Sequence, residues 1–173
     1  MAVRPIIQLG NPVLRRPSRP VEQSQLEEVC ELAGDMFETL MDFRQQYGYG
    51  RGIAAPQVGV NLRVVVIAQE GKPLVMINPR VIRQSEEKEF FWDSCFSCPN
   101  LWYQVERHNQ VAVEYRDSDW QLRMTEAQDD LAELMQHELD HLDGRQAIDL
   151  VTDTNSFCTT DEYFSRHWQQ KDS

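Results

Sequence analysis

The chain has 173 residues, with 28 acidic and 17 basic side chains and a net charge of −11. This length favours one domain spanning residues 1–173. The acidic balance argues against nucleic acid or an anionic membrane as a direct partner. No apolar run approaches the roughly 20 residues that cross a bilayer, and the N-terminus lacks a signal-peptide pattern. We therefore expect a cytoplasmic protein whose four cysteines are reduced or bind metal.

The first regular element is expected to be an amphipathic helix of about six turns, ending near Gln46. Ser24 and Glu27 have the spacing of a capping box, in which the hydroxyl and the carboxylate each bind a backbone N–H group. Gly48 is suited to the C-terminal cap. The apolar stripe of this helix predicts a place in the core and no chemical role.

Apolar and β-branched segments predict strands further along the chain. Asn78-Pro79 is expected to end the second strand, and His108-Asn109 to interrupt the fourth. A second helix is predicted over residues 129–142, with Gly144 as its C-terminal cap, and a short helix over residues 162–169. The strand candidates are residues 62–68, 73–77, 81–92, 103–114 and 120–124.

Two histidines lie four residues apart in the second predicted helix, in the pattern HExxH. His137 and His141 therefore occupy one face of the helix, one turn apart, where both rings can bind the same metal ion. Glu138 places a carboxylate beside them. HExxH is short and occurs by chance, so an ordinary surface helix carrying two histidines is the competing interpretation.

A third metal ligand must come from elsewhere in the chain, and Cys95 is the best candidate. A thiolate with two imidazoles gives three protein ligands and leaves a coordination position open for water. Cys95 and Cys98 also form a CxxC pattern, which occurs in redox pairs and in zinc knuckles. The knuckle would need a second CxxC, and the redox pair a helix directly after its first cysteine. We therefore favour Cys95 as a ligand and Cys98 as a packing residue.

A glycine-rich string, GRGIAAPQ, occupies residues 50–57 between the long helix and the first strand. Its simplest interpretation is a turn. Small residues also let the backbone approach a ligand closely, and the side-chain amide of Gln57 can donate a hydrogen bond to a developing oxyanion.

Together the three strings resemble the peptide deformylase family, whose hallmark is GxGxAAxQ, EGCxS and HExxH in this order. They stand here at residues 50–57, 93–97 and 137–141, and the resemblance covers residues 4 to 150. It implies an α+β fold with antiparallel β-sheets around a central metal-binding HExxH helix, plus a long N-terminal helix.

The resemblance also implies a reaction, the removal of the formyl group from the N-terminal methionine of new polypeptides with release of formate. It implies that Cys95, His137 and His141 bind one divalent ion, Fe²⁺ in cells, with Zn²⁺, Ni²⁺ or Co²⁺ as substitutes. The expected partner is a formylated peptide N-terminus or a small N-formyl substrate, and the ribosome is a further candidate partner.

Physical chemistry is consistent with this reaction. A bound divalent ion lowers the pKa of its water toward about 7, so that hydroxide can attack the formyl carbon. Glu138, which is not a ligand, can take the proton and pass it to the leaving amine. The Gln57 amide and the backbone N–H of Phe96 can donate to the oxyanion, and one such donor is worth about 2.7–4 kcal/mol.

An extended peptide can pair with the backbone of Gly50, Arg51 and Gly52. The remaining residues that we expect at the substrate are Phe91, Asp93, Ser94, Glu133 and Leu134.

Several residues depart from the family pattern. Asp93 and Ser94 stand where the family has Glu and Gly, and Ser94 would be strained if that position needs a positive φ. The arginine usual after this motif is absent, with Trp102 near its place. Glu133 lies one turn before His137, where family members usually carry an apolar residue. A carboxylate there would disfavour an apolar substrate side chain and attract a cation, unless Glu133 turns to solvent or pairs with an arginine.

These departures leave three hypotheses. The chain is a deformylase of N-formylmethionyl peptides, a related amidase for a different N-formyl or N-acyl substrate with a more polar or basic side chain, or a non-catalytic relative that binds peptide or ribosome. Glu138 argues against the third, because binding alone does not need a general base.

Overall fold

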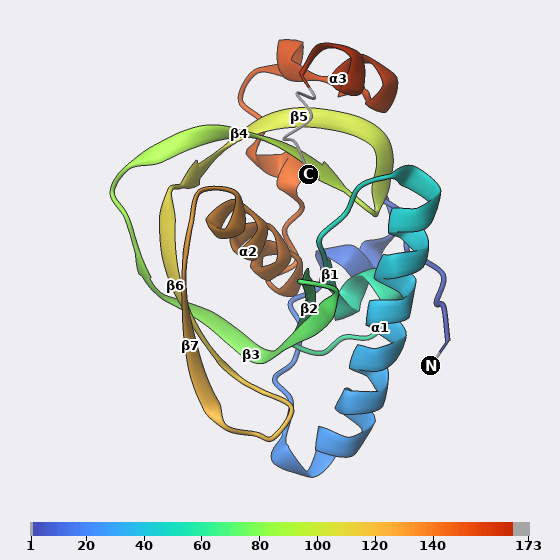
Figure 1. Cartoon of the computed structure of the whole chain (residues 1–173), viewed down its shortest axis with the longest axis vertical. Helices are drawn as coiled ribbons and strands as arrows, with labels where there is room; N and C mark the ends of the chain where they lie inside the picture. The colour runs from blue at the N-terminus through green and yellow to red at the C-terminus, as the bar shows by residue number, and fades with distance from the viewer. Residues whose placement is uncertain (1, 168–173) are drawn as a thin grey trace.

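The computed structural model describes residues 2–167. Its second helix, α2 (Asp129–Leu142), lies in the middle of the molecule, surrounded by strands and flanked by the long helix α1 (Leu26–Tyr47) (Figure 1). This is the α+β arrangement of antiparallel sheets around the HExxH helix that the sequence predicts. Among residues 2–167, no helix is both long and apolar enough to span a membrane.

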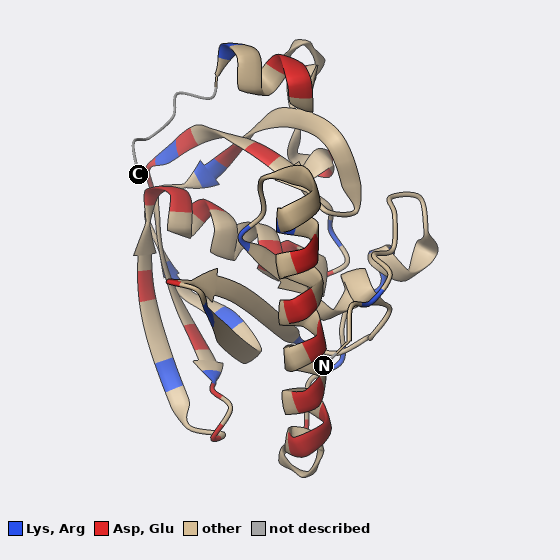
Figure 2. Cartoon of the chain, turned by 45° about the vertical axis from the view of Figure 1, so that its right-hand side comes forward, with Lys and Arg blue, Asp and Glu red and all other residues tan. Residues whose placement is uncertain are grey.

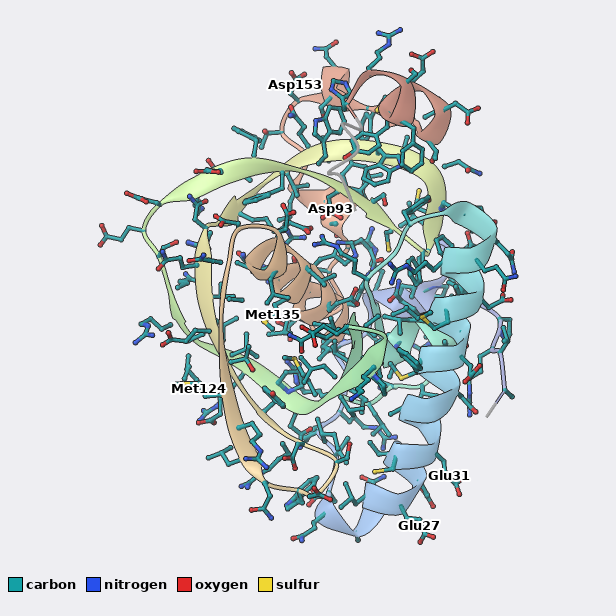
Figure 3. All side chains as sticks on the ribbon, viewed as in Figure 1. Glu27, Glu31, Asp93, Met124, Met135 and Asp153 are labelled. Carbon is teal, nitrogen blue, oxygen red and sulfur yellow. The ribbon has the colours of Figure 1, made fainter. Side chains whose placement is uncertain are left out.

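Helix α1 buries one side and exposes the other. Acidic residues line its outer face along most of its length (Figure 2), and Glu27 and Glu31 point away from the body (Figure 3). Gly48 ends the helix with a φ of 80°, as expected for a left-handed cap. The buried side consists of Val29, Leu32, Ala33, Met36, Thr39, Leu40 and Phe43.

The prediction of a capping box at Ser24 and Glu27 is wrong. A short 3₁₀ turn, Gln23–Gln25, precedes α1, and the box forms on that turn instead. The backbone N–H of Glu22 donates to Oε1 of Gln25 over 3.0 Å.

Five strands form one antiparallel sheet in the order β1-β2-β3-β6-β7. Strand β3 runs through Asn78-Pro79, so the predicted stop is wrong. The register shifts between Ile77 and Arg80 instead, and such a bulge tolerates a proline that cannot donate a backbone hydrogen bond. The strands are β1 (Gly52–Ala54), β2 (Val64–Gln69), β3 (Lys72–Gln84), β6 (Gln110–Arg116) and β7 (Leu122–Gln128).

Three strands form a second antiparallel sheet, β4 (Lys88–Cys95), β5 (Cys98–His108) and β8 (Cys158–Thr159). The segment predicted as one strand over residues 81–92 is divided between β3 and β4, which belong to different sheets. The predicted break near His108-Asn109 is confirmed, and it marks the passage from the second sheet to the first. Between β3 and β4, and again between β5 and β6, the chain passes from one sheet to the other.

Helix α2 packs its apolar residues against the five-stranded sheet. Leu134, Met135 and Leu139 share a buried cluster with Val65 and Val113. Met135 points inward, while Met124 on β7 points outward (Figure 3). Gly144 follows the helix with a φ of 73°, as the cap prediction requires.

The C-terminal helix α3 (Thr160–Arg166) lies beyond β5 (Figure 1). It begins two residues before the helix predicted over residues 162–169, whose last two residues lie outside the described part of the chain.

Candidate metal and catalytic site

Cys95, His137 and His141 converge on one point between β4 and α2. Sγ of Cys95 is 3.3 Å from Nε2 of His141, which is 3.2 Å from Nε2 of His137. A tetrahedral site with metal–nitrogen bonds of about 2.0–2.1 Å and a metal–sulfur bond of about 2.3 Å places its ligand atoms about 3.3–3.6 Å apart. All three residues are buried. The donor set and its spacing therefore fit a divalent transition-metal ion, and Cys98 is not one of the three.

Asp93 orients the first histidine. Its Oδ1 lies 2.8 Å from Nδ1 of His137, which leaves Nε2 of that ring facing the other two ligands. A metal-bound histidine is usually fixed in this way by a carboxylate on its second nitrogen. Burial opposes ionisation of Asp93, but His137 and Arg107 outweigh it and hold the pKa of this carboxyl well below its usual value. Burial and the neighbouring His137 lower the pKa of His141, which favours the neutral ring that a ligand requires.

Arg107 is the main site residue that the sequence alone did not reveal. It lies on β5 and is 3% exposed. One guanidinium nitrogen donates to Asp140 over 2.7 Å, and another lies 3.3 Å from Asp93. Nε is 4.0 Å from Glu133. Despite its burial, these carboxylates raise the pKa of Arg107, so the cation stabilises three buried acids.

Glu138 points toward β1. A Cβ placed on Gly52 would lie 2.6 Å from Oε1 of Glu138, so glycine is required for this close approach. The second oxygen, Oε2, is buried without a hydrogen-bond partner in the described structure. Burial raises the pKa of Glu138 to about 7. These are properties of a carboxylate prepared to exchange a proton near neutral pH.

Gln57 directs its amide into the same site. Oε1 accepts a hydrogen bond from the Ala54 N–H over 2.9 Å, which turns Nε2 toward Sγ of Cys95 at 3.5 Å and Oγ of Ser97 at 3.3 Å. The N-terminal arm fixes both strings, because the Ile7 N–H donates to the carbonyl of Gln57 and the Leu9 N–H to that of Ser97.

Known protein sequences match most of this chain. The model of the polypeptide deformylase family matches residues 3–156. The chain is 40% identical to the peptide deformylase of Rhizobium meliloti, over 88% of this chain and 87% of that protein, and 41% identical to that of Pseudothermotoga lettingae, over 90% and 86%.

The chain belongs to the peptide deformylase family. Solved structures agree. The deformylase of Thermotoga maritima has a TM-score of 0.81 at 30% identity, covering 88% of this chain and 100% of that one. The deformylase of Acinetobacter baumannii with Met-ala-ser bound has a TM-score of 0.80 at 30% identity, covering 87% and 99%. The family resemblance inferred from the three motifs is thereby confirmed.

Glu133 departs from the family pattern, and it forms an ion pair with an arginine. Nη2 of Arg51, from the first deformylase motif, lies 2.9 Å from Oε2 of Glu133, and Nη1 donates to the carbonyl of Asp130 over 3.1 Å. Glu133 is buried, whereas the Arg51 side chain is 48% exposed. Burial and the nearby Asp93 raise the pKa of Glu133 to about 8, against the opposing effect of Arg51. The pairing of Glu133 with an arginine is the alternative that holds.

The other residues predicted to contact the substrate lie in different parts of the structure. Ser94 lies in β4 and is not among the residues with positive φ, so its side chain causes no backbone strain. The ring of Phe96 lies against Gly50, where a Cβ would be 2.5 Å from it. Leu134 belongs to the core cluster behind α2, and Phe91 is half-buried on β4.

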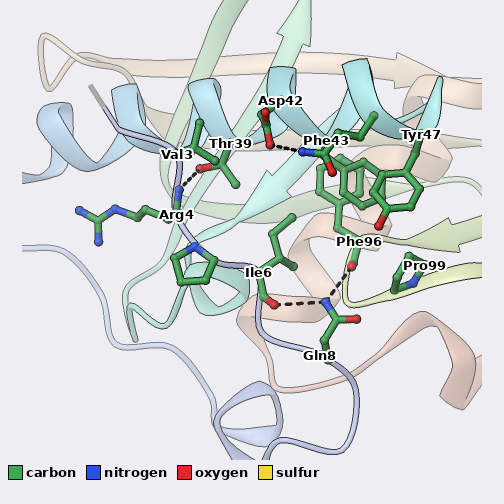
Figure 4. A pocket seen from close by; sticks show the side chains of 12 residues that line it. Val3, Arg4, Ile6, Gln8, Thr39, Asp42, Phe43, Tyr47, Phe96 and Pro99 are labelled. Carbon is green, nitrogen blue, oxygen red and sulfur yellow. Dashed lines mark hydrogen bonds between the residues drawn. The ribbon is translucent and has the colours of Figure 1, made fainter.

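A pocket of about 320 Å³ lies on the outer side of Phe96, between the N-terminal arm and α1 (Figure 4). Its lining includes Phe43, Tyr47 and Pro99, and none of the three metal-ligand candidates. Gln8 also lines the pocket, and its Nε2 donates to the carbonyl of Phe96 over 3.3 Å. This contact helps to fix the backbone that carries the predicted oxyanion donor.

Proposed function

We propose that the chain is a metal-dependent hydrolase that removes the formyl group from N-formylmethionyl peptides and releases formate. The observation that carries this proposal is the convergence of Cys95, His137 and His141 beside Glu138, whose carboxylate lies against Gly52. The relatives named peptide deformylase support it. So does the A. baumannii deformylase with Met-ala-ser bound.

In this proposal Cys95, His137 and His141 hold one divalent ion, with Fe²⁺ as the native metal. A thiolate with two imidazoles suits Fe²⁺ and Zn²⁺ alike. When bound, the ion supplies Lewis-acid chemistry, acidifying water and polarising the formyl oxygen. Asp93 keeps His137 in the ring orientation that the site requires.

Glu138 takes a proton from water and returns it to the leaving amine, so that one residue serves as base and then as acid. Gln57 donates from Nε2, and Phe96 from its backbone N–H, to the oxygen that becomes negative when the formyl carbon is attacked. Oε1 of Gln57 is already engaged by Ala54, and therefore Nε2 is presented without reorganisation.

The peptide is proposed to pair with the backbone of residues 50–52. Strand β1 is at the edge of its sheet, with β2 on one side only, and the other edge can accept an extended peptide. The first side chain of the substrate would then pass over Arg51 and Glu133. Arg51 neutralises Glu133, so the reason to expect a basic first residue is lost, and the aliphatic stem of Arg51 offers an apolar contact.

Phe91, Asp93, Ser94 and Leu134 remain predicted neighbours of the substrate. A nascent peptide as substrate also places the enzyme in the cytoplasm, with the ribosome as a candidate partner.

The proposal is tested by formate release from formyl-Met-Ala-Ser and from formyl-Lys-Ala-Ser by the metal-loaded protein. We expect turnover of both peptides, with the methionine peptide the better substrate. Glu138→Ala should keep the metal and lose turnover, while Glu31→Ala on the exposed face of α1 serves as the matched control. If neither peptide released formate while one metal ion was bound per chain, the proposal would be overturned. Turnover of other N-acyl peptides instead would establish the amidase alternative.

A further inference from the structure

The C-terminal segment, residues 158–167, is anchored on the second sheet by aromatic stacking. The rings of Trp102 on β5 and Tyr163 on α3 are parallel within 4°, with centroids 3.7 Å apart. Nε1 of Trp102 donates to Oγ1 of Thr160 over 3.2 Å, and Trp102 is the register partner of Cys158 in β8. This segment follows the residues that match the family model, which end at residue 156.

The same segment also contacts the residues that precede β1. Phe164, the neighbour of Tyr163, has its ring centroid 6.1 Å from that of Tyr49 and 5.9 Å from that of Trp102. Tyr49 is itself 5.1 Å from Trp102 and directly precedes Gly50. The aromatic rings of α3 therefore join the segment before β1 to β5.

Tyr163 also lies within electrostatic reach of the Arg51–Glu133 pair. Burial is the main cause that raises the pKa of Tyr163, and Asp130 and Glu133 raise it further while Arg51 lowers it. All three of these charges belong to the first turns of α2 or to the segment just before β1.

The geometry of β1 shows which part of a peptide would meet these rings. The reacting end is fixed at Gly52, because Glu138 lies against that residue. An extended peptide pairing antiparallel with this edge runs from Gly52 toward Tyr49, three residues away. At about 3.3 Å per residue this is roughly 10 Å, the position of the third residue after the formyl group.

We infer that Phe164, carried by α3, is a specificity-determining residue that restricts the third substrate residue to small side chains. The inference rests on the proposed function, because it assumes that peptide runs along β1. Tyr163 is buried and anchors the helix on Trp102, whereas Phe164 is half-buried, with its ring centroid 6.1 Å from that of Tyr49. A bulky third side chain has to displace the Phe164 ring, and a serine or alanine does not.

The test compares formyl-Met-Ala-Ser with formyl-Met-Ala-Trp on the full metal-loaded chain. We expect kcat/KM to favour the serine peptide by about tenfold, chiefly through KM, and Phe164→Ala to reduce this ratio to below about twofold. Phe164→Leu, which keeps most of the bulk, and Ser165→Ala, at an exposed position of the same helix, should both retain the wild-type ratio. Any other pattern among these variants, or a wild-type ratio near one, overturns the inference.

Binding of the unformylated peptides Met-Ala-Ser and Met-Ala-Trp, measured by calorimetry, provides a readout that does not need turnover. The ratio of their dissociation constants should follow the same pattern across the three variants. If the chain released no formate from any peptide, the proposed function would fail, and this ratio alone would decide whether Phe164 selects peptides by size.

Discussion

Gly52→Ala is predicted to disable the enzyme by displacing the Glu138 carboxylate. Gly52 lies in β1 and is not among the glycines with positive φ, so alanine fits its backbone conformation. The added methyl group would meet Oε1 of Glu138 at 2.6 Å and its Cγ and Cδ at 3.0 Å. The substitution is therefore a steric test of one contact and not a test of backbone strain.

The size of the effect follows from that distance. Ordinary van der Waals contact begins at 3.4 Å, so the oxygen must retreat by the difference, about 0.8 Å. Misplacement of a reacting group by about 1 Å costs on the order of 10²-fold in rate. A positioned general base contributes about 10²–10⁴-fold in total. We expect kcat for formyl-Met-Ala-Ser to fall by about 10²-fold, with the metal retained and KM changed little.

A double-mutant cycle separates this cause from a general loss of folding. If Gly52→Ala acts through Glu138, it should have almost no further effect in the Glu138→Ala background. The assay is steady-state formate release, with metal content and thermal unfolding measured on each variant. Additive losses in the cycle, or an unchanged kcat in Gly52→Ala, would refute the placement of Glu138 against β1 as the functional arrangement.

Three other substitutions test the groups around the proposed metal ligands. Asp93→Asn should weaken metal binding by about 10–100-fold, because His137 loses the carboxylate on its second nitrogen; competition with a chelator measures this. Gln57→Ala should slow the chemical step by about 10²–10³-fold in single-turnover experiments, at unchanged metal content. Arg107→Met should lower the free energy of unfolding by about 3–5 kcal/mol in a denaturant titration, since Asp93 loses its buried arginine and Asp140 keeps only the exposed Arg145. An Arg107→Met variant as stable as the wild type would contradict the stabilising role of this cation.

The convergence of the three candidate metal ligands could be predicted from the sequence because local spacing fixes most of their geometry. Two histidines four apart share a helix face in any α-helix, and the motif order pointed to Cys95 as the third candidate. The partners of those ligands could not be predicted in the same way. Arg107 reaches Asp93 and Asp140 only because β5 crosses α2, and nothing near residue 107 in sequence signals that crossing.

Two predictions of strand boundaries were wrong for a related reason. The segment over residues 81–92 was predicted as one strand although the polar run at residues 84–88 divides its apolar ends; the two parts belong to different sheets, and sheet membership is a tertiary property. Asn78-Pro79 was expected to end a strand because proline cannot donate. The chain absorbs it in a bulge, while Asn78 exchanges two side-chain hydrogen bonds with the backbone of Val21.

The placement of arginines explains how α2 can carry so many buried acids. Glu133, Glu138 and Asp140 all lie on this helix, and each is less than 6% exposed. A buried carboxylate is costly unless a cation or hydrogen bonds compensate it. Arg51 reaches Glu133 from the segment before β1, and Arg107 reaches Asp140 from β5.

Both arginines therefore come from outside the helix: Arg51 ties it to the segment before β1, and Arg107 ties it to β5. Within residues 2–167 Glu138 forms no such ion pair, and this is the carboxylate that we propose exchanges a proton. The arginines stabilise the acids that hold the site in place, and they leave Glu138, the proposed general base, free to change its charge.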